Sequence, residues 1–137
     1  MTECDVASRM KQVTASVSEE VYLKLHMARL YTRKPIRALI AEGCTIIAEH
    51  YRLQRIAGRT TGAPGLLEHP ALHAAGEGAR KVTGELGADD YLALWQTKVQ
   101  TRRPIKVLVV AACWQIGEHY LAQRRADREA NAQGRRP

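Results

Sequence analysis

The chain has 137 residues, three cysteines, no phenylalanine and a formal net charge of +7. Three cysteines do not make a disulfide framework in a chain of this size, which favours a reducing cytosol. No apolar run approaches the roughly 18 residues that span a bilayer, and the first ten residues, MTECDVASRM, lack the layout of a signal peptide. We therefore expect a cytoplasmic protein with no membrane partner. The basic charge favours a polyanionic partner, nucleic acid before a membrane surface, and the scarcity of aromatics argues against a single-strand stacking platform.

The sequence contains a tandem repeat. Residues 11–55 align without gaps with residues 80–124, at a constant offset of 80 − 11 = 69 positions. The segment TRKPI, Thr32–Ile36, returns as TRRPI, Thr101–Ile105. An ungapped match of this length indicates internal duplication. Two separate units of about 45 residues would be marginally stable, so we expect the two copies to share one core.

Each copy is predicted to begin with a short strand. After a flexible N-terminus, residues 1–9, the apolar residues Val13, Ala15 and Val17 alternate with polar ones. A period of two over six residues is typical of a strand with one buried face. Residues 80–86 repeat this alternation. Because a lone strand leaves its edges unpaired, the two copies could pair as an antiparallel ribbon.

A first helix is predicted after each strand. Ser18 is a suitable N-cap, and Glu19 and Glu20 follow in the first turn, where the helix dipole favours acids. The second copy has Gly87 at the cap position, which caps less well. Trp95 lies on the second of these helices, where His26 stands in the first, and it is expected to fill the core or, as the alternative, to contact a second molecule.

A second, longer helix is predicted to begin at Pro35 and again at Pro104. Proline suits the first helical position, because its missing N–H would be unbonded there anyway. Apolar residues follow at steps of three and four over residues 36–51 and 105–120. Such a stripe indicates one buried helix face of about four turns.

These elements give a simple domain organisation. Repeat 1 covers residues 10–56 and repeat 2 covers residues 80–124. The glycine-rich residues 57–79 form a linker, in which an apolar segment around Leu67 could contact the core. Residues 125–137 are predicted to be a basic disordered tail, whose first part could extend the last helix.

A strand, a helix, a basic turn and a longer helix, twice over, resemble the ribbon-helix-helix family of DNA-binding proteins, which includes the repressors Arc and MetJ. The resemblance covers both repeats. It implies a mainly α fold with a small two-stranded antiparallel β-ribbon. Two chains normally supply the two strands, whereas here one chain holds both as an intrachain pseudo-dimer. That arrangement is similar to the tandem proteins of conjugative plasmids, among them relaxosome accessory proteins.

The resemblance also implies a function. It indicates sequence-specific binding of double-stranded DNA through the ribbon in the major groove. The protein would act as a transcriptional repressor, or as an accessory factor in plasmid conjugation or partition, in a prokaryotic cytoplasm. Self-association on the DNA is compatible with this function.

In this family the outward strand residues contact base edges in the major groove. Gln can bond adenine bidentately, Lys can bond guanine, Glu can accept from cytosine N4, and Thr offers a methyl or a hydroxyl. The corresponding residues here are Gln12, Thr14, Ser16, Lys81, Thr83 and Glu85. Because the two strands differ, we expect an asymmetric or imperfectly palindromic target.

The family also binds a backbone phosphate at the start of each second helix. Free backbone N–H groups and the positive end of the helix dipole attract an anion there. The corresponding residues are Arg33, Lys34, Ile36, Arg37, Arg102, Arg103, Ile105 and Lys106. Because the two segments are nearly identical, we expect a symmetric grip on the DNA backbone.

Other chemistry has little support in the sequence. The pairs Cys44/His50 and Cys113/His119 suggest a Cys₂His₂ metal site. Six residues along a helix correspond to about 240°, however, so each pair points to different faces and no metal or other cofactor is expected. The sequence shows no phosphate-binding glycine loop and no nucleophile with an evident base, so we expect no enzyme. The remaining alternative is a protein–protein interaction module, antitoxin-like or a scaffold, with only non-specific affinity for DNA.

Overall fold

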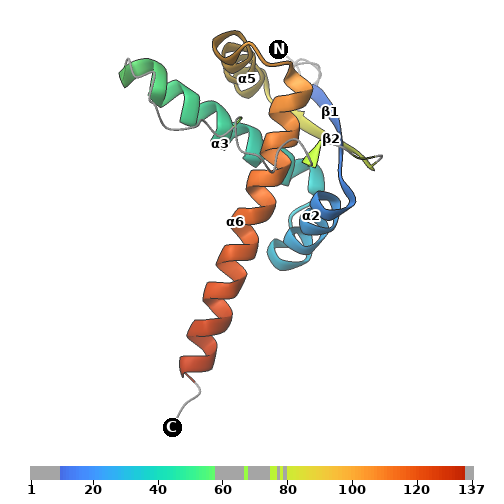
Figure 1. The fold of residues 1–137 in the computed structure, drawn as a ribbon, viewed down its shortest axis with the longest axis vertical. Helices are drawn as coiled ribbons and strands as arrows, with labels where there is room; N and C mark the ends of the chain where they lie inside the picture. Colours follow the sequence, from blue (N-terminus) through green and yellow to red (C-terminus); the bar gives the residue numbers. More distant parts are fainter. Residues whose placement is uncertain (1–9, 58–66, 68–74, 77, 79, 135–137) are drawn as a thin grey trace, which may run out of the picture.

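The computed structural model describes residues 10–57, 67, 75–76, 78 and 80–134. In this part of the chain a strand and two helices occur twice in the same order (Figure 1). The elements are β1 (Lys11–Val17), α2 (Glu19–Thr32), α3 (Ile36–Ala57), β2 (Arg80–Leu86), α5 (Ala88–Thr101) and α6 (Ile105–Gly134). The prediction of a mainly helical fold with a small two-stranded antiparallel sheet is confirmed. The predicted flexible N-terminus and most of the predicted linker lie outside the described residues.

The two strands pair with each other as an antiparallel ribbon. Both have the same alternation of exposed and buried residues, as their sequence patterns predict. Val13, Ala15 and Val17 of β1 point into the core, as do Val82 and Leu86 of β2. The opposite face of the ribbon is therefore left to polar side chains.

The first helices begin as predicted and with unequal caps. The Ser18 hydroxyl accepts a hydrogen bond from the Val21 N–H at 3.3 Å, which satisfies one of the unbonded donors at the start of α2. Gly87 precedes α5 and offers no side chain for the same bond. The start of α5 is therefore held less firmly than the start of α2.

The two copies interlock around one core. The long helices α3 and α6 pack against each other; α6 of the second copy also packs against β1 and α2 of the first, and α3 of the first against β2 and α5 of the second. The two long helices, α3 and α6, cross at Gly43, where an added Cβ would lie 2.5 Å from the Ala112 carbonyl oxygen. Gly43 and Ala112 are equivalent positions of the repeat, since 112 − 43 = 69. Each copy thus completes its core with elements of the other.

The apolar stripes of the long helices form the centre of this core. The predicted faces over 36–51 and 105–120 are buried, except for partial exposure of the first residue of each. Cys44 and Cys113 lie within them as buried thiols. Burial raises the pKa of Cys44 to about 12 and raises the pKa of Cys113 as well. Both cysteines therefore act as small core residues, as predicted.

Trp95 is not in the core, contrary to the prediction. Its side chain is 43% exposed, and the Lys98 ammonium lies 4.0 Å from its ring centroid. The buried positions of α5 are Leu94 and Thr97, so the neighbouring Trp95 faces outward. The tryptophan that packs against the core is Trp114 of α6.

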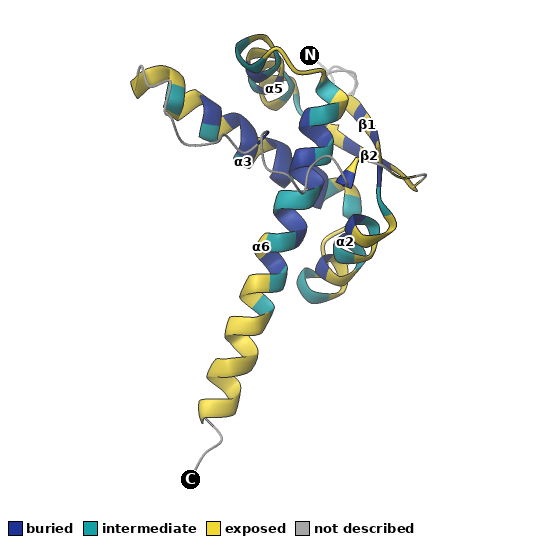
Figure 2. Ribbon diagram, viewed as in Figure 1, coloured by how far each residue is buried: buried dark blue, intermediate teal, exposed yellow. Residues whose placement is uncertain are grey.

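The end of the chain also differs from the prediction of a disordered tail from residue 125. α6 continues without interruption to Gly134 and projects from the body as a long exposed helix (Figures 1 and 2). Its last turns consist mainly of Ala, Arg, Glu and Gln, which are good helix formers, with no proline or glycine before Gly134. The Tyr31 hydroxyl at the end of α2 donates a hydrogen bond to Asp127, which ties the extension to the body. Residues 135–137 lie outside the described part.

Candidate nucleic-acid interface

The ribbon lies at one edge of the molecule, between α2 and α5 (Figure 1). Six side chains predicted to contact bases stand on its outer face, and all six are exposed. They form three cross-strand pairs, namely Gln12 with Glu85, Thr14 with Thr83, and Ser16 with Lys81. Thr14 and Thr83 are equivalent positions of the repeat, since 83 − 14 = 69, and they stand directly opposite each other. The outer face thus has equivalent threonines at its centre and unlike residues towards its ends.

The size of this face suits a DNA groove. Neighbouring strands lie about 4.8 Å apart, and alternate residues along a strand are about 7 Å apart. The major groove of B-DNA is about 12 Å wide and admits a two-stranded ribbon, whereas the minor groove is about 6 Å wide and offers a less distinctive pattern of donors and acceptors. The three pairs present hydroxyl, amide, ammonium and carboxylate groups, which together can bond to every base type.

Arg80, which sequence reasoning did not single out, fixes one end of the ribbon. Its guanidinium bonds to both carboxylate oxygens of Glu19, at 2.7 and 3.3 Å, and lies 5.1 Å from the ring centroid of Tyr22. The hydrogen bond and charge of Arg80 lower the pKa of Glu19. The alternation of apolar and polar residues could not predict this contact, because it joins β2 of the second copy to α2 of the first. Its effect is to position β2 against α2.

Each first helix ends at an arginine in the left-handed backbone conformation. Arg33 has φ 60° and Arg102 has φ 59°, and their N–H groups donate to Arg29 O at 2.7 Å and Lys98 O at 2.8 Å. Glycine is the usual residue at such a position, because other L-residues are strained there by about 1–2 kcal/mol. Both arginine side chains are exposed. The backbone therefore does not explain why arginine stands here twice.

The segments that follow are the basic turns, defined as residues 33–37 and 102–106. In the first, the Pro35 carbonyl accepts from the N–H groups of Ala38 and Leu39, at 3.0 and 3.1 Å. No hydrogen bond among the described residues reaches the N–H groups of Ile36 and Arg37. The second basic turn repeats this geometry around Pro104, and neither long helix has an acid in its first turn. Both helix starts therefore keep free donors and a positive dipole end towards solvent.

The side chains of the two basic turns have different contacts, although their sequences are nearly identical. The Lys34 ammonium lies 3.2 Å from Glu42 Oε2 and 3.3 Å from the Tyr120 hydroxyl, which itself donates to Glu42 Oε1 at 2.6 Å. The bonds to Tyr120 and Glu42 raise the pKa of Lys34. At Arg103, the equivalent of Lys34, the described residues provide no ion pair. The remaining predicted cations, Arg37 and Lys106, are exposed.

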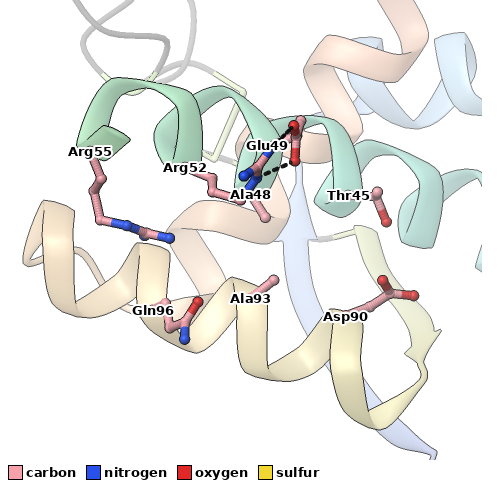
Figure 3. Close-up of a pocket in the computed structure, with 8 residues that line it drawn as sticks. All are labelled: Thr45, Ala48, Glu49, Arg52, Arg55, Asp90, Ala93 and Gln96. Carbon is pink, nitrogen blue, oxygen red and sulfur yellow. Dashed lines mark hydrogen bonds and ion pairs between the residues drawn. The ribbon is translucent and has the colours of Figure 1, made fainter. Parts of the chain in front are cut away.

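A second surface feature lies away from the ribbon, in a hollow between α3 and α5 (Figure 3). Thr45 and Ala93 lie in this hollow, and the equivalent positions on the other side of the molecule hold the larger Trp114 and Lys24, of which Lys24 pairs with Glu118. On its rim, Arg52 pairs with Glu49 at 2.6 Å. The hollow therefore lies where Thr45 of one copy and Ala93 of the other are smaller than their equivalents.

The first helices also carry exposed apolar side chains. Leu23, Met27 and Leu30 stand out from α2, and Leu92, Trp95 and Val99 stand out from α5. Two of these positions correspond between the copies, namely 23 with 92 and 30 with 99. Isolated exposed apolar residues are ordinary, but a stripe on each of two equivalent helices is typical of a contact surface. The sequence analysis did not identify these stripes, although their spacing of three and four was visible in it.

Comparison with known proteins yields no relative that would identify the chain: no family model matches it, no curated protein is similar to it, and no solved structure matches its fold. No helix in the described part of the chain is long and apolar enough to cross a membrane.

Proposed function

We propose that this chain is a sequence-specific double-stranded DNA-binding protein that inserts its ribbon into the major groove. One observation carries the proposal: an antiparallel ribbon exposes three pairs of polar side chains, and a basic turn with free N–H donors lies in each copy. Base edges would be contacted by the outer ribbon face and phosphates by the two helix starts. This division between specific and positioning contacts is usual in protein–DNA interfaces.

The proposed architecture is a ribbon-helix-helix pseudo-dimer within one chain. Two features support it, since equivalent residues meet at the centre of the ribbon, Thr14 with Thr83, and at the crossing of the long helices, Gly43 with Ala112. The interlocked packing of the two copies also supports it. Because Gln12 and Ser16 are replaced by Lys81 and Glu85, the target would be an imperfect palindrome.

The left-handed arginines strengthen the proposal for the basic turns. Arginine in a left-handed cap position that glycine would occupy without strain is a reason to look for a function of the side chain. Arg33 and Arg102 each stand immediately before a helix start with free donors, where a phosphate would gain both a charge and backbone bonds. We therefore assign both arginines to phosphate contacts.

The biological role that we propose is that of a prokaryotic repressor, or of an accessory factor in plasmid conjugation or partition. This part of the proposal rests on the family resemblance alone. Mapping the bound DNA sequence in its genome would decide between the two, because a repressor binds at promoters and an accessory factor at a transfer origin or partition site.

The proposal is tested by selection from a randomised duplex library, followed by titration of the selected duplex by fluorescence anisotropy at several salt concentrations. The logarithm of the association constant is plotted against the logarithm of the salt concentration. Six cationic side chains at the basic turns would give this plot a slope of about −5, at roughly 0.9 per phosphate. Enrichment of an imperfectly palindromic sequence with such a slope is expected. A library without enrichment, or an affinity that ignores salt, contradicts the proposal.

A second candidate function, a protein–protein interaction module, is favoured by the apolar stripes of α2 and α5. The same stripes could join neighbouring copies on DNA. Light scattering of the chain alone and with the selected duplex distinguishes these cases. A single copy in free solution with several copies on the duplex supports DNA-dependent self-association, whereas association without DNA favours the module.

A further inference from the structure

Glu42 is the acidic residue that distinguishes the two basic turns. It lies in α3 and contacts both Lys34 and Tyr120, the latter from the middle of the other long helix. The position equivalent to Glu42 in the second copy is Ala111, because 111 − 42 = 69, and this alanine is buried. No carboxylate can therefore stand at the same place beside Arg103.

The two copies also differ in the contacts of an equivalent pair of tyrosines. Tyr120 accepts a hydrogen bond from the Lys34 ammonium and donates to Glu42. Its equivalent in the first copy is Tyr51, whose hydroxyl accepts a hydrogen bond from the Leu67 N–H at 3.2 Å. Tyr51 of the first copy thus contacts the segment between the repeats, whereas Tyr120 of the second copy completes a three-membered cluster with Lys34 and Glu42.

This cluster limits what Lys34 can offer to a phosphate. An ammonium has three donors, and two of them point to Glu42 and Tyr120. A phosphate that approached Lys34 would also come near the negative charge of Glu42, and like charges repel. Arg103 instead carries five donors in a fork that matches a phosphate bidentately.

We infer that Glu42 weakens the phosphate contact of the first basic turn, so that the chain grips DNA unequally and mainly through the second basic turn at the start of α6. This inference rests on the proposed function, because it assigns unequal strengths to the same two phosphate contacts. The consequence is that the two halves of an imperfect palindrome are bound differently. The half-site next to the start of α6 is held mainly by contacts to the DNA backbone, whereas the half-site next to the start of α3 depends more on base contacts from the ribbon.

The test compares Glu42→Gln with Glu49→Gln in the full-length chain. Both variants remove one negative charge from α3, but Glu49 pairs with Arg52 in the hollow away from the ribbon. The probe is a random-sequence duplex of about 30 base pairs, roughly three helical turns, titrated by anisotropy over a range of salt. Glutamine can keep the bond from Tyr120, and thermal unfolding of each variant controls for loss of fold.

We expect Glu42→Gln to tighten binding about two- to fivefold, the range that one partly exposed ion pair allows. The dependence on salt should steepen, because Lys34 then contributes a full phosphate contact. Glu49→Gln should leave affinity and salt dependence nearly unchanged. Lys34→Ala should lower the affinity for the duplex slightly in the natural chain and more strongly in the Glu42→Gln background. Arg103→Ala should lower the affinity more than Lys34→Ala does in both backgrounds.

The outcomes separate the inference from the proposed function. If the natural chain binds DNA and Glu42→Gln behaves like Glu49→Gln, the inference is overturned and the proposed function stands. Equal losses for Lys34→Ala and Arg103→Ala would overturn it too. If the natural chain binds no duplex at low salt, the proposed function fails and the inference fails with it.

Discussion

Replacing both left-handed arginines with glycine should weaken DNA binding without weakening the fold. Arg33 and Arg102 have φ near 60°, a conformation that costs a non-glycine residue about 1–2 kcal/mol and costs glycine almost nothing. Glycine also raises the entropy of the unfolded chain, which offsets about 0.4–1 kcal/mol per site. Each Arg→Gly change should therefore raise the free energy of unfolding by about 0–1.6 kcal/mol, the difference between these two effects.

The effect on DNA should have the opposite sign. Each lost phosphate contact removes about 0.9 from the slope of log affinity against log salt, so the double variant should lose about 1.8. Urea unfolding followed by circular dichroism gives the stability, and anisotropy with a random duplex gives the slope. Arg52→Gln with Arg55→Gln is the matched control, because it removes the same charge from the hollow between α3 and α5. A double glycine variant that unfolds more easily, or that keeps the natural slope, refutes the reasoning.

Three further predictions concern the core and the apolar stripes. Gly84→Ala should lower the free energy of unfolding by about 1–3 kcal/mol in urea titrations, because the new Cβ would lie 2.6 Å from a methyl carbon of Ile40; unchanged stability would mean that α3 does not pack closely on β2. In a Cys4→Ser background, Cys44 and Cys113 should resist a thiol reagent at pH 8 until urea unfolds the chain, because burial raises the pKa of both thiols; rapid labelling of the folded chain would contradict their burial. Leu30→Ser should leave the thermal midpoint nearly unchanged, because this side chain is 73% exposed, and should reduce the number of copies per duplex in light scattering if the stripes join neighbours; an unchanged number argues against that contact.

The sequence predicted the elements well because each has a strong local signal. The alternation in β1 and β2 fixes which residues face inward, and the stripes of the long helices identify their buried faces. Because the chain is duplicated, each pattern occurs twice. The second copy supplies a partner strand for the first, so the pairing of β1 with β2 could be predicted from one chain. These signals depend only on neighbouring residues and on the burial of apolar groups.

The features that sequence analysis missed depend on contacts between distant residues. The order of charges around TRKPI and TRRPI predicted equal basic turns, but the difference lies at Glu42 and Tyr120, which join Lys34 only after α3 and α6 cross. The sequence does not show which of Trp95 and Trp114 is the more buried. For Trp95 this depends on which face of α5 packs against α3, and that is decided by the packing of the whole core. The extension of α6 to Gly134 depends on the helix-forming residues of its last turns and on the contact between Tyr31 and Asp127, neither of which follows from the charge of this segment.

The central claim is that the outer ribbon face determines sequence preference, and one variant tests it most directly. The variant truncates four exposed side chains on the ribbon face that points away from the core, by combining Gln12→Ala, Thr14→Ala, Lys81→Ala and Thr83→Ala. The measurement is the ratio of affinities for the selected duplex and a random duplex at one salt concentration, with circular dichroism as the control for fold. The ratio should fall close to one while the random duplex is still bound through the basic turns. A folded variant that keeps the natural ratio would contradict the account.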